Sequence, residues 1–494
     1  MAFLCLAVLI LAIDDGILNL ALPAIAREFQ ASTSELQWAI NAYLLAFAAL
    51  LLTMGALGDR FGRKRMFQIG LILFGVSSLA AALSTSMGML IACRALMGVG
   101  GAITIPQTLS IIRATFTDPK ERVQMIGIWA GIFALGYGIG PVVGGALLEH
   151  FEWYSVFLFN IPVAIIALAG AYFFLWESKG ESAPRLDLPG AVLSIAGLFS
   201  LVYGIIEAGK ESWTESSVII WLSAGAILLL IFAWWEKRSY HPMLPMRFFK
   251  NMSFTGANMA MTLASFSLVA LLFFLSQYFQ TVQGHSPLEA ALLLLPSGVI
   301  MMVSTLAAAQ VARAIGVKLP VSLGIFIGGL GLFYLSFASA DTSYLVILGG
   351  MGVVSVGFGL AWSPATDSVM GSLPESRAGI GSAMDATTQQ VGAALGVAIL
   401  GAMMNGVYLD KVENMGVAAS LPEGANEAIR SSIQSAHIIA GQFPEEISQL
   451  IVVGSNDAFA SGMTQAMFIG AIVMVLTSLV ALRILPTQIR LSQE

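Results

Sequence analysis

The sequence predicts an all-α polytopic membrane protein with fourteen transmembrane helices, and three observations support this fold class. Hydrophobic residues make up 57% of the 494 residues and charged residues only 11%, whereas soluble domains usually carry about 25% charged residues. The apolar residues form runs of about 20 along most of the chain, the length that crosses a bilayer. No barrel-length alternation of apolar and polar residues occurs, so the backbone of each run pairs within its own helix.

Fourteen apolar runs are long enough to be spans. The first lacks a basic segment and continues into two aspartates, so we interpret it as a span and not as a signal peptide. The spans are expected at 3–24, 36–57, 66–86, 88–114, 123–148, 153–176, 188–208, 217–236, 252–279, 287–311, 320–339, 343–371, 378–406 and 463–485.

The positions of lysine and arginine predict the orientation of the spans. If the N-terminus is cytoplasmic, 18 of the 23 basic residues lie on the cytoplasmic side, four lie outside, and Arg94 lies within a span. Basic residues concentrate in cytoplasmic loops. We therefore expect both termini inside and an even number of spans.

The spans divide into three predicted parts. Residues 3–176 hold six spans, 177–250 hold two additional spans with their linkers, and 251–494 hold the last six. A weak repeat supports paired halves, because GALGDRFGRKR (55–65) and AAAQVARAIGVKLP (307–320) both follow spans on the cytoplasmic side.

A long polar segment, 407–461, separates the last two spans on the predicted outer side. One interpretation is a helical hairpin lying over the outer mouth. The other is a solvated loop without a role, and the sequence leaves both open.

The segment GALGDRFGRKR is the most specific feature of the chain. It places an acid and several arginines at the cytoplasmic end of the second span, in a turn opened by glycines. Such an acid can pair with basic groups or a helix N-terminus in one conformation and release them in another. We interpret the segment as a conformational latch, with a basic topology anchor as the alternative. The latch residues are Gly55, Gly58, Asp59, Arg60, Gly62 and Arg63.

Few charged residues lie within the spans: Asp14, Asp15, Arg94, Asp367 and Asp385. Such groups cost several kcal/mol to bury and usually mark a transport pathway. Burial moves the pKa of a carboxyl group towards neutrality, so it can take up and release protons. An ionised carboxylate also attracts a cation. Competition between a proton and a lipophilic cation for one acid would therefore suffice to exchange them.

The fifth span carries a stripe of glycines. Gly136, Gly140 and Gly144 recur every four residues on one face, which permits close helix contact. Pro141 removes a backbone donor and favours a bend. A gating interface and plain helix packing both fit this pattern.

Four segments in order resemble motifs of the major facilitator superfamily, in its fourteen-span drug:proton antiporter branch, and are closest to Qac-type antiseptic and dye exporters. The segments are LAIDDGILNLALP (11–23), GALGDRFGRKR (55–65), LIACRALMGVGGA (90–102) and GYGIGPVVGG (136–145). The resemblance covers the chain from the first span to the end. It implies a major facilitator fold with two six-helix bundles and two extra central helices.

The resemblance also implies roles for individual residues. Asp14 occupies the family's acidic position and Arg94 its buried arginine, so both are expected to couple proton movement to transport, with Asp15 as a second titrating site or a neighbour. Arg94 is expected to pair with an acid of the first span and hold it ionised. The fifth-span residues Gly136, Gly140, Pro141, Gly144 and Gly145 match the antiporter motif, which favours the gating interpretation.

The expected substrate contacts are less specific. Asp385, with Gln389 one turn later, is preferred to Asp367 as the acid that binds a cation; backbone capping near Pro364 is the alternative for either. Asn41 stands where related exporters often carry an acid, so monovalent cations are expected rather than divalent ones. Aromatic residues could line a cation–π cavity, although most such rings face lipid or core. These residues are Trp38, Tyr43, Trp129, Tyr137 and Trp362.

The sequence therefore predicts a proton-coupled exporter of lipophilic cations that works as a monomer in the cell membrane. No enzyme activity, cofactor, metal site or nucleic-acid partner is expected: no complete phosphate-binding loop occurs, and the four histidines are scattered. The expected partners are the bilayer, small cations and protons. Export of a natural metabolite, peptide or lipid is the main alternative, and a membrane-embedded enzyme is a distant one.

Overall fold

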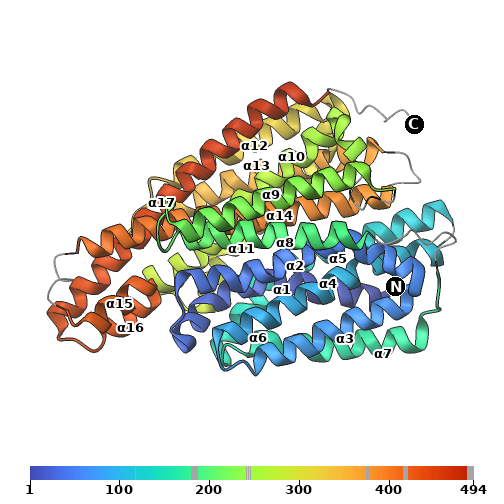
Figure 1. Cartoon of the computed structure of the whole chain (residues 1–494). Helices are drawn as coiled ribbons and strands as arrows, with labels where there is room; N and C mark the ends of the chain where they lie inside the picture. The colour runs from blue at the N-terminus through green and yellow to red at the C-terminus, as the bar shows by residue number, and fades with distance from the viewer. Residues whose placement is uncertain are drawn as a thin grey trace. The chain divides into compact units, whose positions relative to one another are not determined.

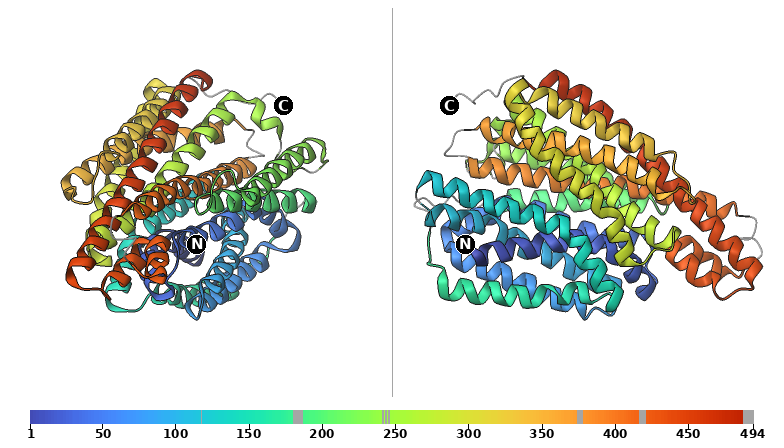
Figure 2. Two further views of the ribbon diagram at one scale, coloured as in Figure 1. Left: turned by 60° about the vertical axis from the view of Figure 1, so that its left-hand side comes forward. Right: turned by 180° about the vertical axis from the view of Figure 1, so that it is seen from behind.

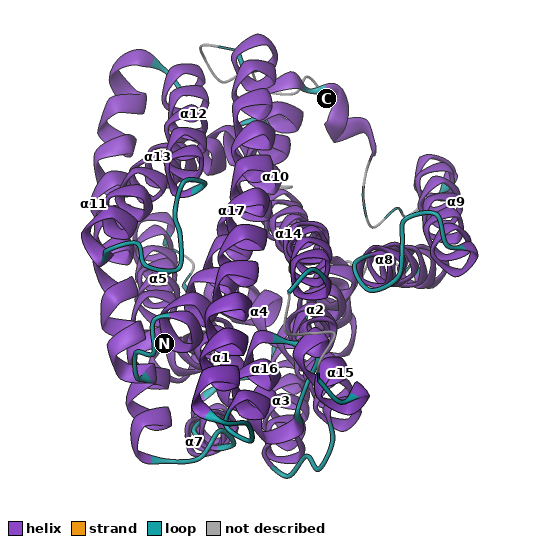
Figure 3. Ribbon diagram, turned by 90° about the vertical axis from the view of Figure 1, so that its left-hand side faces the viewer, coloured by secondary structure: helices purple, strands orange, loops and turns teal. Residues whose placement is uncertain are grey.

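The computed structural model describes residues 1–116, 118–179, 187–240, 242, 244, 246–373, 378–415 and 421–486. Within these residues, fourteen helices are long and apolar enough to cross a membrane, which confirms the predicted number. Figure 1 labels the helices, and Figure 3 shows helices joined by loops throughout the described chain.

The helices follow one another with short connections. Their bounds are α1 Ala2–Phe29, α2 Thr33–Phe61, α3 Arg63–Ala82, α4 Met87–Thr115, α5 Pro119–His150, α6 Ser155–Leu158, α7 Asn160–Phe174, α8 Leu188–Ala208, α9 Ser216–Arg238, η1 Met246–Lys250, α10 Met252–Gln277, η2 Tyr278–Val282, α11 Pro287–Ile315, α12 Lys318–Leu335, α13 Tyr344–Gly371, α14 Ala378–Glu413, α15 Glu423–Ser431, α16 Ile433–Ala440 and α17 Glu445–Ile484.

Local chemistry fixes several helix ends. Ser86 accepts a hydrogen bond from the Met89 amide at the start of α4, and Ser286 forms a reciprocal capping box with Glu289 at the start of α11. Gly62 separates α2 from α3 with a φ of 113°, a conformation that side-chain-bearing residues rarely adopt. The turn in the predicted latch therefore depends on this glycine.

The segment between the last two spans is shorter than predicted. α14 continues to Glu413 and α17 begins at Glu445, so both helices extend well beyond the apolar runs. Polar side chains do not end a helix that projects from the bilayer, which is why hydropathy ended α14 too early in the chain and began α17 too late. Between them, α15 and α16 form a helical hairpin beside α17 (Figure 1).

The described hairpin is docked and not a solvated loop. The Tyr408 hydroxyl donates to the Ile429 carbonyl at 2.8 Å. The buried Gln434 amide donates to Gln277 Oε1 at 3.2 Å and to Thr281 Oγ1 at 3.3 Å. These contacts tie the hairpin to α14, α10 and η2.

The chain forms two compact units. The first contains Met1–Asn19, Ala39–Leu201 and Ser223–Met246; the second contains Leu20–Trp38, Val202–Leu222 and Arg247–Glu494. Boundaries between the two units lie within helices α1, α2, α8 and α9 and not between helices. The predicted division at residues 176 and 250 stays a prediction.

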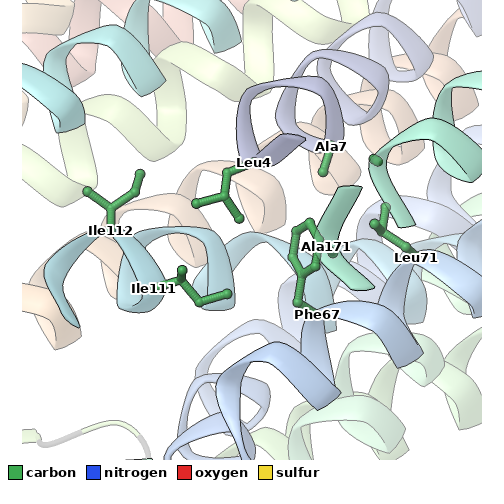
Figure 4. Packing of buried hydrophobic residues seen from close by; sticks show 8 residues of the cluster. Leu4, Ala7, Phe67, Leu71, Ile111, Ile112 and Ala171 are labelled. Atoms are coloured by element: carbon green, nitrogen blue, oxygen red, sulfur yellow. The ribbon is translucent and has the colours of Figure 1, made fainter. Parts of the chain in front are cut away.

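The first unit has an apolar core where four helices meet. The core residues are Leu4, Ala7, Phe67, Leu71, Ile111, Ile112, Ala167 and Ala171, from α1, α3, α4 and α7 (Figure 4). Small residues on α1 and α7 let the larger side chains of α3 and α4 interdigitate. This core holds together the helices that carry the site described below.

The second unit uses glycines for close helix contacts. A Cβ atom on Gly324 of α12 would lie 2.6 Å from the Gly357 carbonyl oxygen of α13, and one on Gly462 of α17 would lie 2.6 Å from the Met404 carbonyl oxygen of α14. Such contacts let backbones approach closely. In Figure 2, α12 and α13 run side by side.

Candidate ion-coupling site

A buried ion pair lies in the first unit between α1 and α4. Arg94 Nη1 lies 2.6 Å from Asp14 Oδ2, and the two side chains are only 2% and 4% exposed. The expected pairing of Arg94 with an acid of the first span is thereby confirmed. Breaking a buried pair leaves an uncompensated charge and typically costs about 3–5 kcal/mol, so the two groups depend strongly on each other.

Two further contacts hold the Arg94 side chain. Its Nε donates to the Ala39 carbonyl at 3.3 Å, and its guanidinium carbon lies 4.4 Å from the centre of the Tyr43 ring. Sequence reasoning placed Tyr43 in a substrate cavity. In the structure its buried ring faces the protein's own cation instead, so it stabilises Arg94.

Asn160 completes the surroundings of Asp14, and sequence reasoning missed it. Asn160 Nδ2 donates to Asp14 Oδ1 at 2.8 Å and to Ser78 Oγ at 3.0 Å. The Ser78 hydroxyl donates in turn to the Phe157 carbonyl at 2.9 Å. The amide within the apolar run FLFNIPV was the available signal, but an uncharged side chain marks a buried site less strongly than a charged one.

Asp15 faces a different set of neighbours from Asp14, as expected for adjacent helix positions about 100° apart. The Tyr43 hydroxyl is in hydrogen-bonding contact with the Asp15 carboxyl group, and Tyr137 of α5 lies close enough to interact with its charge. Asp15 is half-buried whereas Asp14 is buried. The two acids therefore share the Arg94 region without sharing a hydrogen-bonding partner.

The glycine stripe of α5 packs directly on the part of α1 that carries the acids. A Cβ atom on Gly136 would lie 2.8 Å from the Ala12 Cβ, and one on Gly140 would lie 2.9 Å from the Ile13 carbonyl oxygen. A Cβ on Gly144 would lie 3.0 Å from Ile17 Cγ1. The stripe thus forms one continuous contact, and any larger residue would displace α1.

Pro141 and its neighbours continue this contact. A Cβ atom on Gly16 of α1 would lie 3.0 Å from Pro141 Cδ and 3.3 Å from the Tyr137 carbonyl oxygen. Pro141 lies inside α5, and Gly145 is buried beside Gly144. The sequence predicted the stripe but could not tell which helix it meets.

The predicted latch contains an ion pair. Arg63 Nη2 lies 2.7 Å from Asp59 Oδ1 across the junction of α2 and α3, while Arg60 is exposed and lies over the Phe61 ring. A side chain on Gly58 would overlap the Gln107 amide, and Gly55 faces Pro106 of α4. The glycines therefore bring α2 against α4 where the latch begins.

Glu177 is a second acid of the latch, and it lies outside the motif. Its carboxylate accepts hydrogen bonds from the backbone amides of Lys64 at 3.1 Å and Arg65 at 3.2 Å, at the N-terminus of α3. The Lys64 ammonium donates to the Tyr172 and Leu175 carbonyls at 2.8 Å each. The Glu177 carboxylate thereby satisfies free backbone amides at the positive end of α3. The motif is thus tied to the end of α7.

The second unit holds the other predicted acids. Asp385 on α14 is buried, with Gln389 and Thr366 as its neighbours, and its Oδ1 has no hydrogen-bond partner among the described residues. Asp367 on α13 is exposed. The structure thus separates the two candidates by their surroundings.

The remaining predicted contacts lie in several places. Trp38 packs against Tyr203 at a ring-centre distance of 5.9 Å, and Trp362 packs against Phe358 at 4.9 Å. Trp129 donates to Thr108 Oγ1 at 2.9 Å and packs against the core of the first unit.

Asn41 is fully buried on α2 of the first unit. Both its amide nitrogen and its amide oxygen lack hydrogen-bond partners among the described residues. A buried amide with neither atom satisfied is costly, which makes Asn41 a suitable contact for a polar or cationic ligand.

Comparison with known proteins places this architecture in a family. Residues 4–397 match the model of the Major Facilitator Superfamily. The multidrug efflux pump LfrA of Mycolicibacterium smegmatis is 34% identical over 474 residues, covering 96% of this chain and 93% of LfrA. The methyl viologen resistance protein SmvA of Salmonella typhimurium is 34% identical over 453 residues, covering 91% of this chain and 90% of SmvA.

Solved structures show the same fold. A bacterial homologue of the human lysosomal transporter Spinster, in an inward-facing conformation, aligns with a TM-score of 0.65 at 16% identity, covering 98% of this chain and 96% of the homologue. A D-xylose–proton symporter aligns with a TM-score of 0.64 at 16% identity, covering 98% and 97%. The chain therefore belongs to the Major Facilitator Superfamily and is a multi-pass membrane transporter, not an enzyme.

Proposed function

We propose that this transporter exports lipophilic cations in exchange for protons by alternating access. The observation that carries the proposal is the Asp14–Arg94 pair, which lies on the stretch of α1 that contacts the α5 glycine stripe. A titratable acid at a close helix interface can link protonation to helix movement. The multidrug efflux relatives support the direction of transport.

Proton uptake changes the charge of this site. A proton that binds Asp14 displaces Arg94 from the carboxylate, and the freed guanidinium leaves the cluster one charge more positive. Loss of the proton restores the pair and makes the cluster one charge more negative, which favours a cation in a low-dielectric surrounding. Protons and cations therefore alternate, and the proton gradient supplies the energy without a cofactor.

The α5 stripe supplies the moving interface. The glycines give α5 a smooth face towards α1, so the helices can slide or tilt with little steric resistance. The Asp59–Arg63 pair acts as the latch on the predicted cytoplasmic side, where it favours one conformation. Both termini are assigned to the cytoplasm, and the working unit is the monomer in the bilayer.

Asp385 is the acid we assign to substrate cations, because it is buried and one of its oxygens is unpartnered. SmvA is a methyl viologen resistance protein, and methyl viologen is an aromatic dication. This chain carries the neutral Asn41 where related exporters often have an acid. We therefore expect a preference for monovalent cations such as ethidium.

Ethidium efflux from vesicles tests this function. With an imposed pH gradient, the native protein should export ethidium and Asp14→Asn should not, because asparagine cannot carry the proton. Asp118→Asn, at an exposed acid before α5, is the matched control and should transport normally. If a folded native protein moves no ethidium, the cation proposal fails.

Export of a natural product is the second candidate. It is favoured by the relatives named as the tetracenomycin C resistance and export protein of Streptomyces glaucescens and the cephamycin export protein of Amycolatopsis lactamdurans. The same vesicles, loaded with a neutral or anionic polyketide or β-lactam, would then show pH-driven efflux while ethidium stays inside.

A further inference from the structure

The two oxygens of Asp14 are held by side chains of different length. Oδ2 faces the Arg94 guanidinium at 2.6 Å, and Oδ1 accepts from Asn160 Nδ2 at 2.8 Å. Arg94 has a long side chain with many rotamers and a second partner at the Ala39 carbonyl. Asn160 has a short side chain and is fully buried at the start of α7.

A hydrogen-bond chain fixes the orientation of the Asn160 amide. The Ser78 hydroxyl uses its only proton on the Phe157 carbonyl, at 2.9 Å. Its oxygen can therefore only accept from Asn160, and it does so at 3.0 Å. The amide nitrogen must face both Ser78 and Asp14, so Asn160 cannot turn away when Asp14 changes its protonation state.

We propose that Asn160 is a positioning residue that holds Asp14 Oδ1 in both protonation states and so reserves Oδ2 as the oxygen that exchanges Arg94 for a proton. This inference rests on the proposed function of Asp14. In the exchange, the incoming proton bonds to a lone pair of Oδ2, and Arg94 leaves with its charge unchanged. Oδ1 becomes the carbonyl oxygen of the acid and still accepts the Asn160 N–H.

The Asn160 contact also leaves a mark on the protonated acid. A hydrogen bond to a carbonyl oxygen weakens the C=O bond slightly and lowers its stretching frequency. A protonated Asp14 that keeps Asn160 on Oδ1 therefore absorbs at a lower wavenumber than one that has lost this donor.

Infrared spectroscopy of the purified protein at acid pH tests this role. The carbonyl band of protonated Asp14 is obtained as the difference between the native protein and Asp14→Asn. In Asn160→Leu, which keeps the size but lacks the donor, the band should move to a higher wavenumber, because Oδ1 has lost its hydrogen bond. In Ser78→Ala, which removes only the anchor, the band should move in the same direction by less.

An unchanged band in folded Asn160→Leu would overturn the inference; if that variant does not fold, an unchanged band in Ser78→Ala would do so. The spectrum does not depend on transport. If the native protein fails to move ethidium but the band still moves in the variant, the proposed function falls and the role of Asn160 stands. If ethidium moves and the band is unchanged in the variant, only the role of Asn160 falls.

Discussion

The buried aspartates of the two units have opposite surroundings. Asp14 in the first unit has a partner on each oxygen, Arg94 on one and Asn160 on the other. Asp385 in the second unit has no positive partner among the described residues, and its Oδ1 is unpartnered. The comparison teaches that one fold can bury a carboxyl group in two ways, with a positive partner or without one. In the function we propose, the paired acid holds Arg94 until a proton replaces it, and the unpaired acid attracts a substrate cation.

The largest effect is expected when Asp14 is made to resemble Asp385. Arg94→Ala leaves Asp14 buried without a positive partner, at a cost of about 3–5 kcal/mol unless the acid takes up a proton. Proton-driven efflux should fall at least about a hundredfold, because the acid stays protonated. This fall corresponds to a rise of about 3 kcal/mol in the barrier to transport. Vesicle efflux and the thermal midpoint measure both effects. Undiminished efflux would show that Asp14 does not need its partner.

The next effect separates the α5 interface from the rest of that helix. Gly140→Leu places a side chain against the Ile13 carbonyl and should block transport more than about tenfold, as steric overpacking typically costs about 1–3 kcal/mol. Gly138→Leu is the matched control, since a Cβ atom there meets no atom within 4 Å. Equal efflux by the two variants would contradict a gating role for the α5 glycine stripe.

Much of this comparison could be predicted from the sequence, because its main residues are charged. Asp14, Arg94 and Asp385 stand out in apolar runs, and fourteen spans follow from hydropathy alone. Asn160 was missed because an uncharged amide costs less to bury and gives a weaker signal. Its partnership with Asp14 joins residues 146 positions apart, and no local pattern records such a contact.

Glu177 and the outer helices show the same limit. Glu177 lies more than a hundred residues after the amides it accepts from, so the latch motif could not include it. The first turns of α17 are polar, and hydropathy therefore began that helix too late in the chain. Contacts between distant segments and helices that leave the bilayer need the three-dimensional structure.

A moderate effect should distinguish the acids of the second unit. Asp385→Asn removes a buried charge and should weaken ethidium binding about tenfold, which corresponds to about 1.4 kcal/mol. Asp367→Asn alters an exposed acid and should change binding less. Fluorescence titration of ethidium measures both. A larger loss in Asp367→Asn would exchange the roles assigned to these two residues.

The smallest effect concerns the outer hairpin of the second unit. Burial lowers the pKa of His437, and the Arg27 cation lowers it further, while the contact with Asn456 at 2.7 Å opposes them. The docked hairpin thus binds fewer protons than an undocked one, so its stability should fall as the pH falls through the ordinary histidine range near 6.5. After correction for the intrinsic pH dependence of amide exchange, the protection of the α16 amides should be lower at low pH in the native protein, and His437→Gln should remove that dependence. An equal dependence in both would assign it to another group.

Proton release on cation binding tests the central claim most directly. Ethidium is added to the purified protein in weak buffer, and the protons released per bound ethidium are measured for the native protein, Asp14→Asn and Asp385→Asn. The account predicts release by the native protein, none by Asp14→Asn, and unchanged release per bound cation by Asp385→Asn, whose binding is weaker. If Asp14→Asn binds ethidium and releases as many protons as the native protein, Asp14 is not the proton carrier.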